Sequence, residues 1–269
     1  MLAIKNNLMA SNAARHLGQS YDALAKSVER LSSGLRINSS KDDAAGLAVR
    51  ELMRADVAVL QQGTRNAQDG ISMLQTMEGA MQTVDEALVR MKQLAEQAAT
   101  ESYTPTQRTI MNSEFTQMAD EINRIATATK FNGIQMLNSS ASKTIQFGGA
   151  DDFIAVAGAD MTKSGLGIST LNITSRGGAL SALGAIDSAI GAKDTARAAF
   201  GYQMNRLEMS VSVMGIQSEN LLAAESRISD VDVATEVATM TRNQVLAQAG
   251  TAMLAQANTI PQMALTLLR

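Results

Sequence analysis

The chain has 269 residues, of which 45% are hydrophobic but only 3% are aromatic, and it contains 17 Met, 2 Pro and no Trp. This composition favours seams between helices over a thick globular interior. A net charge of -3 gives no reason to expect a nucleic-acid or anionic-membrane partner, and the lack of Cys excludes disulfides and thiolate metal sites.

The first predicted element is an amphipathic helix from about residue 3 to residue 33. Its apolar positions step by four and three residues and are Leu17, Tyr21, Leu24, Val28 and Leu31. The run Ser32-Ser33-Gly34 is typical of a helix end. Residues 35–39 are then expected to form a polar joint. Ser40 and Asp43 have the spacing of a capping box, which predicts that Ser40 opens the next helix.

A second helix is predicted from Lys41 to about Ala99, because no proline interrupts this stretch. Its apolar seam repeats every 3.5 residues, which indicates a partner helix. The seam consists of Leu74, Met77, Met81, Val84, Leu88, Met91, Ala95 and Ala98. Such a helix would be roughly 85–90 Å long, so the sequence predicts a rod.

A third helix is expected to start at Thr104-Pro105-Thr106-Gln107, which combines a Thr cap, Pro at the first helical position and a capping-box Gln. We expect it to fold back antiparallel on the second helix and to stop near Phe131-Asn132-Gly133. Its seam residues are Met111, Phe115, Met118, Ile122 and Ile125.

The pattern changes between residues 138 and 178. Residues 143–147 and 153–157 alternate weakly around a Gly- and Asp-rich turn, which predicts a β-hairpin. The Gly- and Ser-rich stretch that follows is expected to be loop, with room for one more strand near residues 171–174.

From about Ala179 the helical seam returns, with polar Lys193 and Arg197 among its positions. Its apolar members are Leu183, Ile186, Ile190, Phe200, Met204, Leu207, Val211, Met214, Leu221 and Ile228. A break at Ser229-Asp230 leads to a last helix, which we expect Pro261 to bend or interrupt. The apolar positions of that helix include Val233, Val237, Met240, Leu246 and Met253.

The fold class predicted from these elements is mainly α. We expect a long coiled-coil rod of antiparallel helices, paired N- and C-terminal helices and one small β-hairpin. Residues 1–40 and 231–269 should form the paired terminal helices. Residues 41–230 should form the rod domain, with the hairpin and loop at 138–178 and no outer insertion domain.

Catalytic, cofactor and metal sites are not expected. The single His16 has no Cys partner, and the neighbouring Asp42 and Asp43 diverge on a helix and are better explained as caps. The N-terminus lacks the apolar run of a cleaved secretory signal, and the uncharged stretch 243–268 contains too much Gln and Asn to cross lipid. If secreted, the protein should therefore use a route without a cleaved signal.

The runs ERLSSGLRINSSKDDAAGLA (residues 29–48) and RNAQDGISMLQTMEGAM (65–81) resemble the N-terminal signature of bacterial flagellins. SRISDVDVATEV (226–237) and residues 243–269 resemble the C-terminal signature. The resemblance implies a self-polymerising subunit of the flagellar filament, with an inner tube of paired terminal helices and an outer tube of rod helices. It also implies type III export, an export chaperone, a cap complex and hook-junction proteins as partners.

Two alternatives share some of these features. A hook–filament junction protein has the same terminal architecture but forms a short collar. A coiled-coil scaffold or adhesin would instead assemble as a small closed bundle. The C-terminal run AQANTIPQMALTLLR favours filament flagellin.

A surface patch for a host receptor is also predicted. Arg90 and Leu94 lie one helical turn apart beside the seam, and Glu114 should stand at the same level of the helical hairpin. All three match positions by which similar flagellins are sensed by the flagellin-specific Toll-like receptor. Val89, Gln93 and Glu96 depart from the receptor-active pattern. The alternative is that the patch serves only subunit packing.

Overall fold

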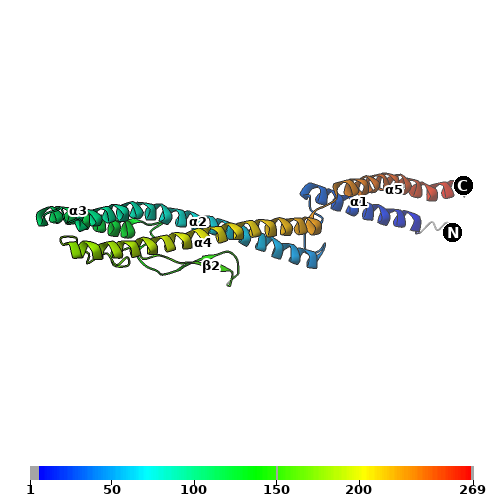
Figure 1. Ribbon diagram of the computed structural model, residues 1–269. Helices are drawn as coiled ribbons and strands as arrows, with labels where there is room; N and C mark the ends of the chain where they lie inside the picture. The colour runs from blue at the N-terminus through cyan, green and yellow to red at the C-terminus, as the bar shows by residue number, and fades with distance from the viewer. Residues whose placement is uncertain (1–5, 150, 268–269) are drawn as a thin grey trace. The chain divides into compact units, whose positions relative to one another are not determined.

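The computed structural model describes residues 6–149 and 151–267, and it divides into two compact units. Unit 1 comprises residues 1–57 and 219–269, and unit 2 comprises residues 58–218. Within the described residues the regular elements are α-helices and one two-stranded antiparallel sheet, so the predicted fold class is confirmed (Figure 1). The elements are α1 (Leu8–Ser33), α2 (Ala44–Ala99), α3 (Pro105–Ala128), β1 (Lys143–Gln146), β2 (Phe153–Val156), α4 (Arg176–Ser229) and α5 (Val233–Leu267).

The joint between α1 and α2 differs from the prediction at its second half. Helix α1 ends as expected, because Gly34 adopts the left-handed conformation with φ 73° and donates its N–H to Arg30. The predicted capping box at Ser40 is wrong: α2 begins at Ala44, and the Asp43 carboxylate accepts the Gly46 N–H at 2.9 Å. Asp42 turns back into the joint instead, where its Oδ1 lies 2.7 Å from the Lys26 ammonium.

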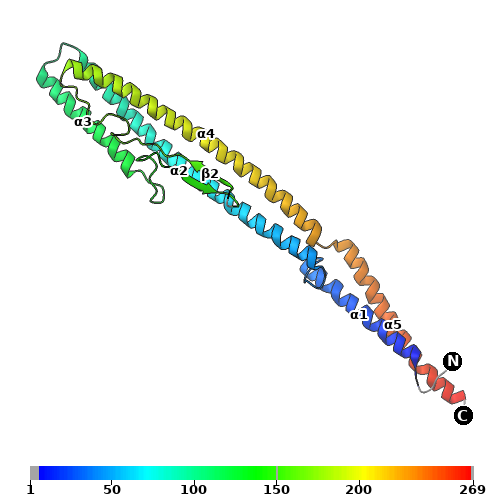
Figure 2. The same ribbon diagram turned by 90° about the horizontal axis from the view of Figure 1, so that it is seen from below.

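In unit 2, α3 and α4 both run antiparallel to α2 (Figure 2). Arg108 donates to the carbonyls of Ala98 and Thr100 and so closes the α2–α3 turn. Thr104 and Gln107 form the predicted capping box. Between α2 and α4, Lys92 pairs with Asp187, and ion pairs farther along each helix keep the same antiparallel order.

The core of unit 2 lies in the seam where these three helices meet. Phe115, Ile122, Phe200 and Leu207 are at most 1% exposed. Met118, Met204 and Val211 are partly buried against the same cluster. The α2 side of the seam is inaccessible to solvent and contains Leu74, Met77, Met81, Val84, Leu88, Met91, Ala95 and Ala98.

The β-hairpin packs directly on α2, where two glycines remove the side chains that would block it. A Cβ on Gly63 would lie 2.0 Å from the Phe147 carbonyl oxygen, and one on Gly70 would lie 2.1 Å from Ile145 Cδ1. Between them, the Asn66 amide donates to the Gln146 carbonyl at 2.9 Å. The two glycines therefore lower the helix propensity of α2 but allow the hairpin to pack closely against it.

Two expectations outside the helical seams are corrected. Residues 171–174 form no strand, because the Ile173 N–H is satisfied by the Asn112 side chain at 2.9 Å rather than by a neighbouring strand. Helix α5 continues through Pro261, so the proline does not interrupt it.

Candidate functional site

The terminal helices α1 and α5 of unit 1 pair antiparallel. The Asn7 amide donates to the Ala257 carbonyl at 2.8 Å near one end, and Arg30 pairs with Glu236 at 3.5 Å near the other. The residues of α1 that are most shielded step by three and four: Ala10, Ala13, Leu17, Ser20, Leu24, Ser27 and Leu31. Those of α5 do the same: Glu236, Met240, Asn243, Ala247, Gly250, Leu254 and Ala257. Four of the seven residues on the α1 side and three of the seven on the α5 side are Ala, Ser or Gly, which allows the helices to approach closely at those positions.

The pair of terminal helices has a thin interior. Of the hydrophobic side chains described in unit 1, only Ile37, Val57, Ala247 and Ala257 are fully buried. A helix pair that buries so little apolar surface cannot offset much of the entropy of ordering its own chain.

Helix α1 carries a second seam that stays exposed among the residues that the structure describes. We call it the outer α1 seam; its steps are again four and three, it is uncharged, and every member is exposed: Ala14, Gly18, Tyr21, Ala25 and Val28. The predicted single seam of α1 is therefore divided. Leu17, Leu24 and Leu31 face α5, whereas Tyr21 and Val28 are half exposed, at 51% and 50%. A heptad seam of this kind is typical of a surface that packs on another helix.

Helix α5 also exposes apolar side chains. Val245, Leu246 and Met253 are at least half exposed, and no residue from Asn243 to Ile260 is charged. Leu246 and Met253 line a groove between α5 and α1, together with His16 and Leu17. His16 thus lies in a mainly apolar groove of the terminal helices. Unit 1 therefore presents apolar surface on both of its long helices.

The two joints of the chain are hydrogen-bonded to each other, and we call this contact the clasp. Arg36 N–H donates to the Ser229 carbonyl at 2.6 Å, and Val231 N–H donates to the Gly34 carbonyl at 3.0 Å. The Arg36 guanidinium also caps the C-terminus of α4 by donating to the Ile228 carbonyl at 2.6 and 3.2 Å. The sequence alone did not predict this clasp, although the break at Ser229-Asp230 was recognised.

The joint between α1 and α2 also holds an acidic residue, Asp42, whose pKa is shifted. The Lys26 ammonium lowers the pKa of Asp42 from 3.8 to about 2, and the backbone N–H groups of Ser39 and Asn38 act in the same direction. Asp42 therefore stays ionised over nearly the whole pH range in which proteins fold.

The structure brings together two of the three residues predicted to form the receptor patch. Arg90 on α2 and Glu114 on α3 are both half exposed and pair at 2.7 Å. The third assignment is wrong as a surface position: Leu94 is only 2% exposed and belongs to the core of unit 2. Helix α2 has partner helices on two sides here, so its buried face is wider than a single seam.

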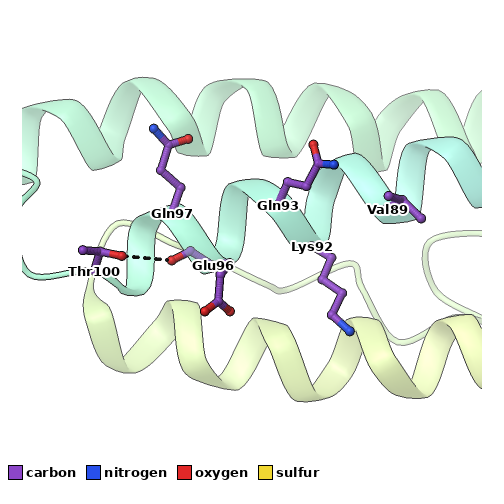
Figure 3. A pocket seen from close by; sticks show the side chains of 6 residues that line it. All are labelled: Val89, Lys92, Gln93, Glu96, Gln97 and Thr100. Atoms are coloured by element: carbon purple, nitrogen blue, oxygen red, sulfur yellow. Dashed lines mark hydrogen bonds between the residues drawn. The ribbon is translucent and has the colours of Figure 1, made fainter.

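A shallow groove follows the solvent-facing side of α2 near this ion pair (Figure 3). Its walls are Val89, Lys92, Gln93, Glu96, Gln97 and Thr100. Lys92 and Glu96 point toward α4, whereas Gln93 and Gln97 point toward α3, and Val89 is exposed. The three positions that depart from the receptor-active pattern, Val89, Gln93 and Glu96, are thus all on this accessible surface.

One charged residue interrupts the α2–α4 seam. Lys193 is 2% exposed and pairs with Asp85 of α2 and, at 2.8 Å, with Asp194. Burial by itself would lower the pKa of Lys193, but the ion pairs with Asp194 and Asp85 outweigh it and leave this pKa above its ordinary value. The polar break expected in the seam is therefore a paired, buried cation.

Within residues 6–149 and 151–267, no helix is both long and apolar enough to cross a membrane. The same described part of the chain contains no group of His, Asp or Glu side chains that could hold a metal ion.

Comparison with known proteins identifies the family. The bacterial flagellin N-terminal helical region matches residues 4–142, and the bacterial flagellin C-terminal helical region matches residues 183–268. A flagellin of Halalkalibacterium halodurans is 43% identical, and the alignment covers 100% of both chains.

Two solved structures are also similar. The crystal structure of Bacillus cereus flagellin has a TM-score of 0.51 and 32% identity, and it covers 60% of this chain and 94% of its own. A flagellar hook-associated protein from Vibrio parahaemolyticus has a TM-score of 0.58 over 70% of this chain and 100% of its own, but at 14% identity it shows the fold alone. With both flagellin regions matched and a full-length flagellin relative, this chain belongs to the bacterial flagellin family and is a subunit of the flagellar filament.

Proposed function

We propose that the subunit polymerises head to tail through its terminal helices, and that this growth builds the extracellular filament used for motility. The observation that carries the proposal is the outer α1 seam, which is apolar, uncharged and uncovered over four helical turns. A contact between two different surfaces of a subunit does not close, so it generates a helical polymer. The chain then acts mechanically, with no catalytic step and no cofactor.

The thin interior of unit 1 supports a further part of this proposal. Residues 1–40 and 231–269 form the inner tube of the filament, and they become fully ordered only when neighbouring subunits cover them. Burial of Tyr21, Val28, Leu246 and Met253 between subunits would then supply the apolar contacts that α1 and α5 lack alone. Residues 41–230 would form the outer tube.

The family relationship supports the remaining partners. We propose that the subunit is exported through the flagellar type III apparatus and that an export chaperone holds its exposed C-terminal segment. We further propose that a cap complex adds subunits to the growing tip of a filament that starts at the hook-junction proteins. The apolar, uncharged stretch of α5 supports the need for a chaperone, because such a surface would otherwise associate before export.

Removal of residues 243–269 tests the pairing of the terminal helices. Polymerisation should be lost while the helical circular dichroism of unit 2 remains, and sedimentation would show monomers. Tyr21→Glu should likewise block growth, because it places a charge in the outer α1 seam. Asn12→Glu is the control, since it adds a charge beside Arg15 on the opposite side of α1. Normal filaments from the truncated chain would refute the proposal.

Electron microscopy after seeding separates this function from its alternatives. A filament subunit should give long helical filaments. A junction protein should not extend the seeds, and a closed-bundle scaffold should give discrete oligomers.

We also propose recognition of the monomer by the flagellin-specific Toll-like receptor. The exposed Arg90–Glu114 ion pair supports this, whereas the burial of Leu94 removes the apolar contact first assigned to the patch. A reporter assay should detect wild-type monomer and lose the signal with Arg90→Ala. A silent wild-type monomer would leave subunit packing as the role of the patch.

A further inference from the structure

The turn that follows α3 contains a chemically reactive pair of residues, Asn132 and Gly133, which is the one Asn-Gly pair in the sequence. Both residues are exposed, and both have positive φ, at 49° and 79°. Phe131 and Ile134 exchange backbone hydrogen bonds of 3.0 and 2.9 Å across the pair, which forms the tip of a two-residue turn. We call residues 131–134 the Asn132 turn, and all of it lies in unit 2.

The two groups that would have to react with each other are not engaged elsewhere. Among residues 6–149 and 151–267, neither the Asn132 side-chain amide nor the Gly133 N–H has a hydrogen-bond partner. Apart from its two chain neighbours, no atom lies within 4 Å of a Cβ built on Gly133, so the space beside its nitrogen is open. Glycine itself has no side chain to shield that nitrogen.

Similar groups elsewhere in unit 2 are held in place. The Asn138 amide donates to the Gln135 side chain at 2.8 Å. Asp69-Gly70 has similar chemistry, but it lies within α2, where the Gly70 N–H belongs to the helical series of hydrogen bonds. The Asn132 turn therefore combines a reactive sequence with exposed and unengaged reacting groups.

We propose that Asn132 is a site of spontaneous deamidation, with water as the co-reactant. The Gly133 backbone nitrogen gives up its proton and attacks Asn132 Cγ. A bond from that nitrogen to Cγ forms, the Cγ–Nδ2 bond breaks, and Nδ2 leaves as ammonia with the released proton. Water then opens the resulting succinimide ring. Cleavage of the new bond to Cγ gives Asp, cleavage of the original peptide bond gives isoaspartate, and no group is oxidised or reduced.

The two products affect the turn differently, although each adds one negative charge to the net charge of -3. Asp keeps the length of the backbone and tolerates a left-handed conformation. Isoaspartate adds one methylene group to the main chain, so the hydrogen bonds between Phe131 and Ile134 lose their register. Phe131 packs against the core of unit 2, and isoaspartate should therefore loosen this part of the core.

Peptide mapping of the full-length chain tests the site. The monomer is incubated at neutral pH in water enriched in oxygen-18, and trypsin cleavage after Lys130 and Lys143 then releases a peptide that contains both Asn132 and Asn138. Asn138 precedes Ser, so it is an internal control. Asn132 should take up one oxygen-18 at least about tenfold faster than Asn138, because Gly leaves the attacking nitrogen unshielded. Its rate should be within about tenfold of that of the chain unfolded in guanidinium, because the turn is exposed.

Two variants separate the ring chemistry from the added charge. Asn132→Gln should suppress the reaction, because its longer side chain closes a six-membered ring more slowly. Isoaspartyl methyltransferase should therefore label the aged wild-type chain and leave aged Asn132→Gln unlabelled. The isoaspartate form, separated by anion exchange, should melt about 2–4 °C below fresh chain, whereas Asn132→Asp should melt within about 1 °C of it.

Two outcomes would overturn the inference. The first is a folded chain in which Asn132 deamidates no faster than Asn138, or more than about tenfold slower than in the unfolded chain. The second is an isoaspartate form that melts with fresh wild-type chain, which would refute the loosening of the turn. Neither result depends on polymerisation, because every measurement uses the monomer.

Discussion

Replacing Gly63 by Ala should destabilise unit 2, although Ala is the better helix former. The added Cβ would lie 2.0 Å from the carbonyl oxygen, 2.8 Å from the carbonyl carbon and 2.9 Å from the Cα of Phe147. All three are backbone atoms of the hairpin, so no side-chain rotation can relieve the clash. The hairpin must move away from α2.

The expected magnitude follows from three contributions. Helix propensity favours Ala by about 1 kcal/mol. Overpacking costs about 1–3 kcal/mol, and the displaced hairpin weakens the hydrogen bond from Asn66 to Gln146, which contributes about 1 kcal/mol. The net expectation is a loss of about 1–3 kcal/mol in the free energy of unfolding.

Gly79→Ala is the matched control on the same helix. Apart from the neighbouring residues and backbone of α2 itself, no atom lies within 4 Å of a Cβ built on Gly79, so the propensity gain should appear alone as a stabilisation of about 0.5–1 kcal/mol. Urea unfolding of monomers, followed by circular dichroism, measures both variants. If Gly63→Ala stabilised the monomer as much as Gly79→Ala, the close packing of the hairpin on α2 would be disproved.

Three further outcomes are expected. Lys193→Met should change the free energy of unfolding by less than about 1 kcal/mol, because it removes both the ion pairs and the burial of a charge. Asp85→Ala should cost about 1–2 kcal/mol, because it leaves Lys193 buried with Asp194 alone. Urea unfolding measures both, and a larger loss for Lys193→Met than for Asp85→Ala would contradict this reasoning. Met81→Asp should cost several kcal/mol and the neighbouring, exposed Gln82→Asp less than about 0.5 kcal/mol in thermal melts, and equal shifts would show that the seam is misassigned. Because the pKa of Asp42 is lower in the folded state, its stabilising effect is complete above pH 4 and is lost as the pH falls toward 2. Wild type and Asp42→Asn should therefore differ in hydrogen-exchange protection of the α1–α2 joint at pH 4, and this difference should vanish as the pH falls to 2. A difference that stays constant down to pH 2 would contradict the Lys26 pairing.

Local sequence signals located the helices well because each depended on residues close together in the chain. Thr104 and Gln107 cap α3 through contacts three residues apart, and the α2 seam was readable because one uninterrupted stripe faces its partners. The Asn132-Gly133 pair also predicted a turn, and both residues adopt positive φ in the structure. Helix α3 itself ends earlier, at Ala128.

The errors arose where a distant residue decides the local structure. Asp42 leaves the helix cap to Asp43 because Lys26 of α1 attracts it, and Ile173 stays out of a sheet because Asn112 of α3 satisfies its N–H. Leu94 is buried because α2 is flanked by two helices rather than one. None of these partners could be assigned from spacing along a single helix.

The clasp also constrains the order in which the chain can fold. Arg36 and the Ile228 carbonyl are 192 residues apart in sequence, and closing a flexible loop of that length costs about 4–5 kcal/mol of chain entropy. The few hydrogen bonds of the clasp cannot meet that cost by themselves. The clasp therefore has to close together with other contacts that join the two ends of the chain, such as the pairing of α1 with α5 in the same unit. A chain emerging in sequence cannot lock its N-terminal joint until the C-terminal one has arrived.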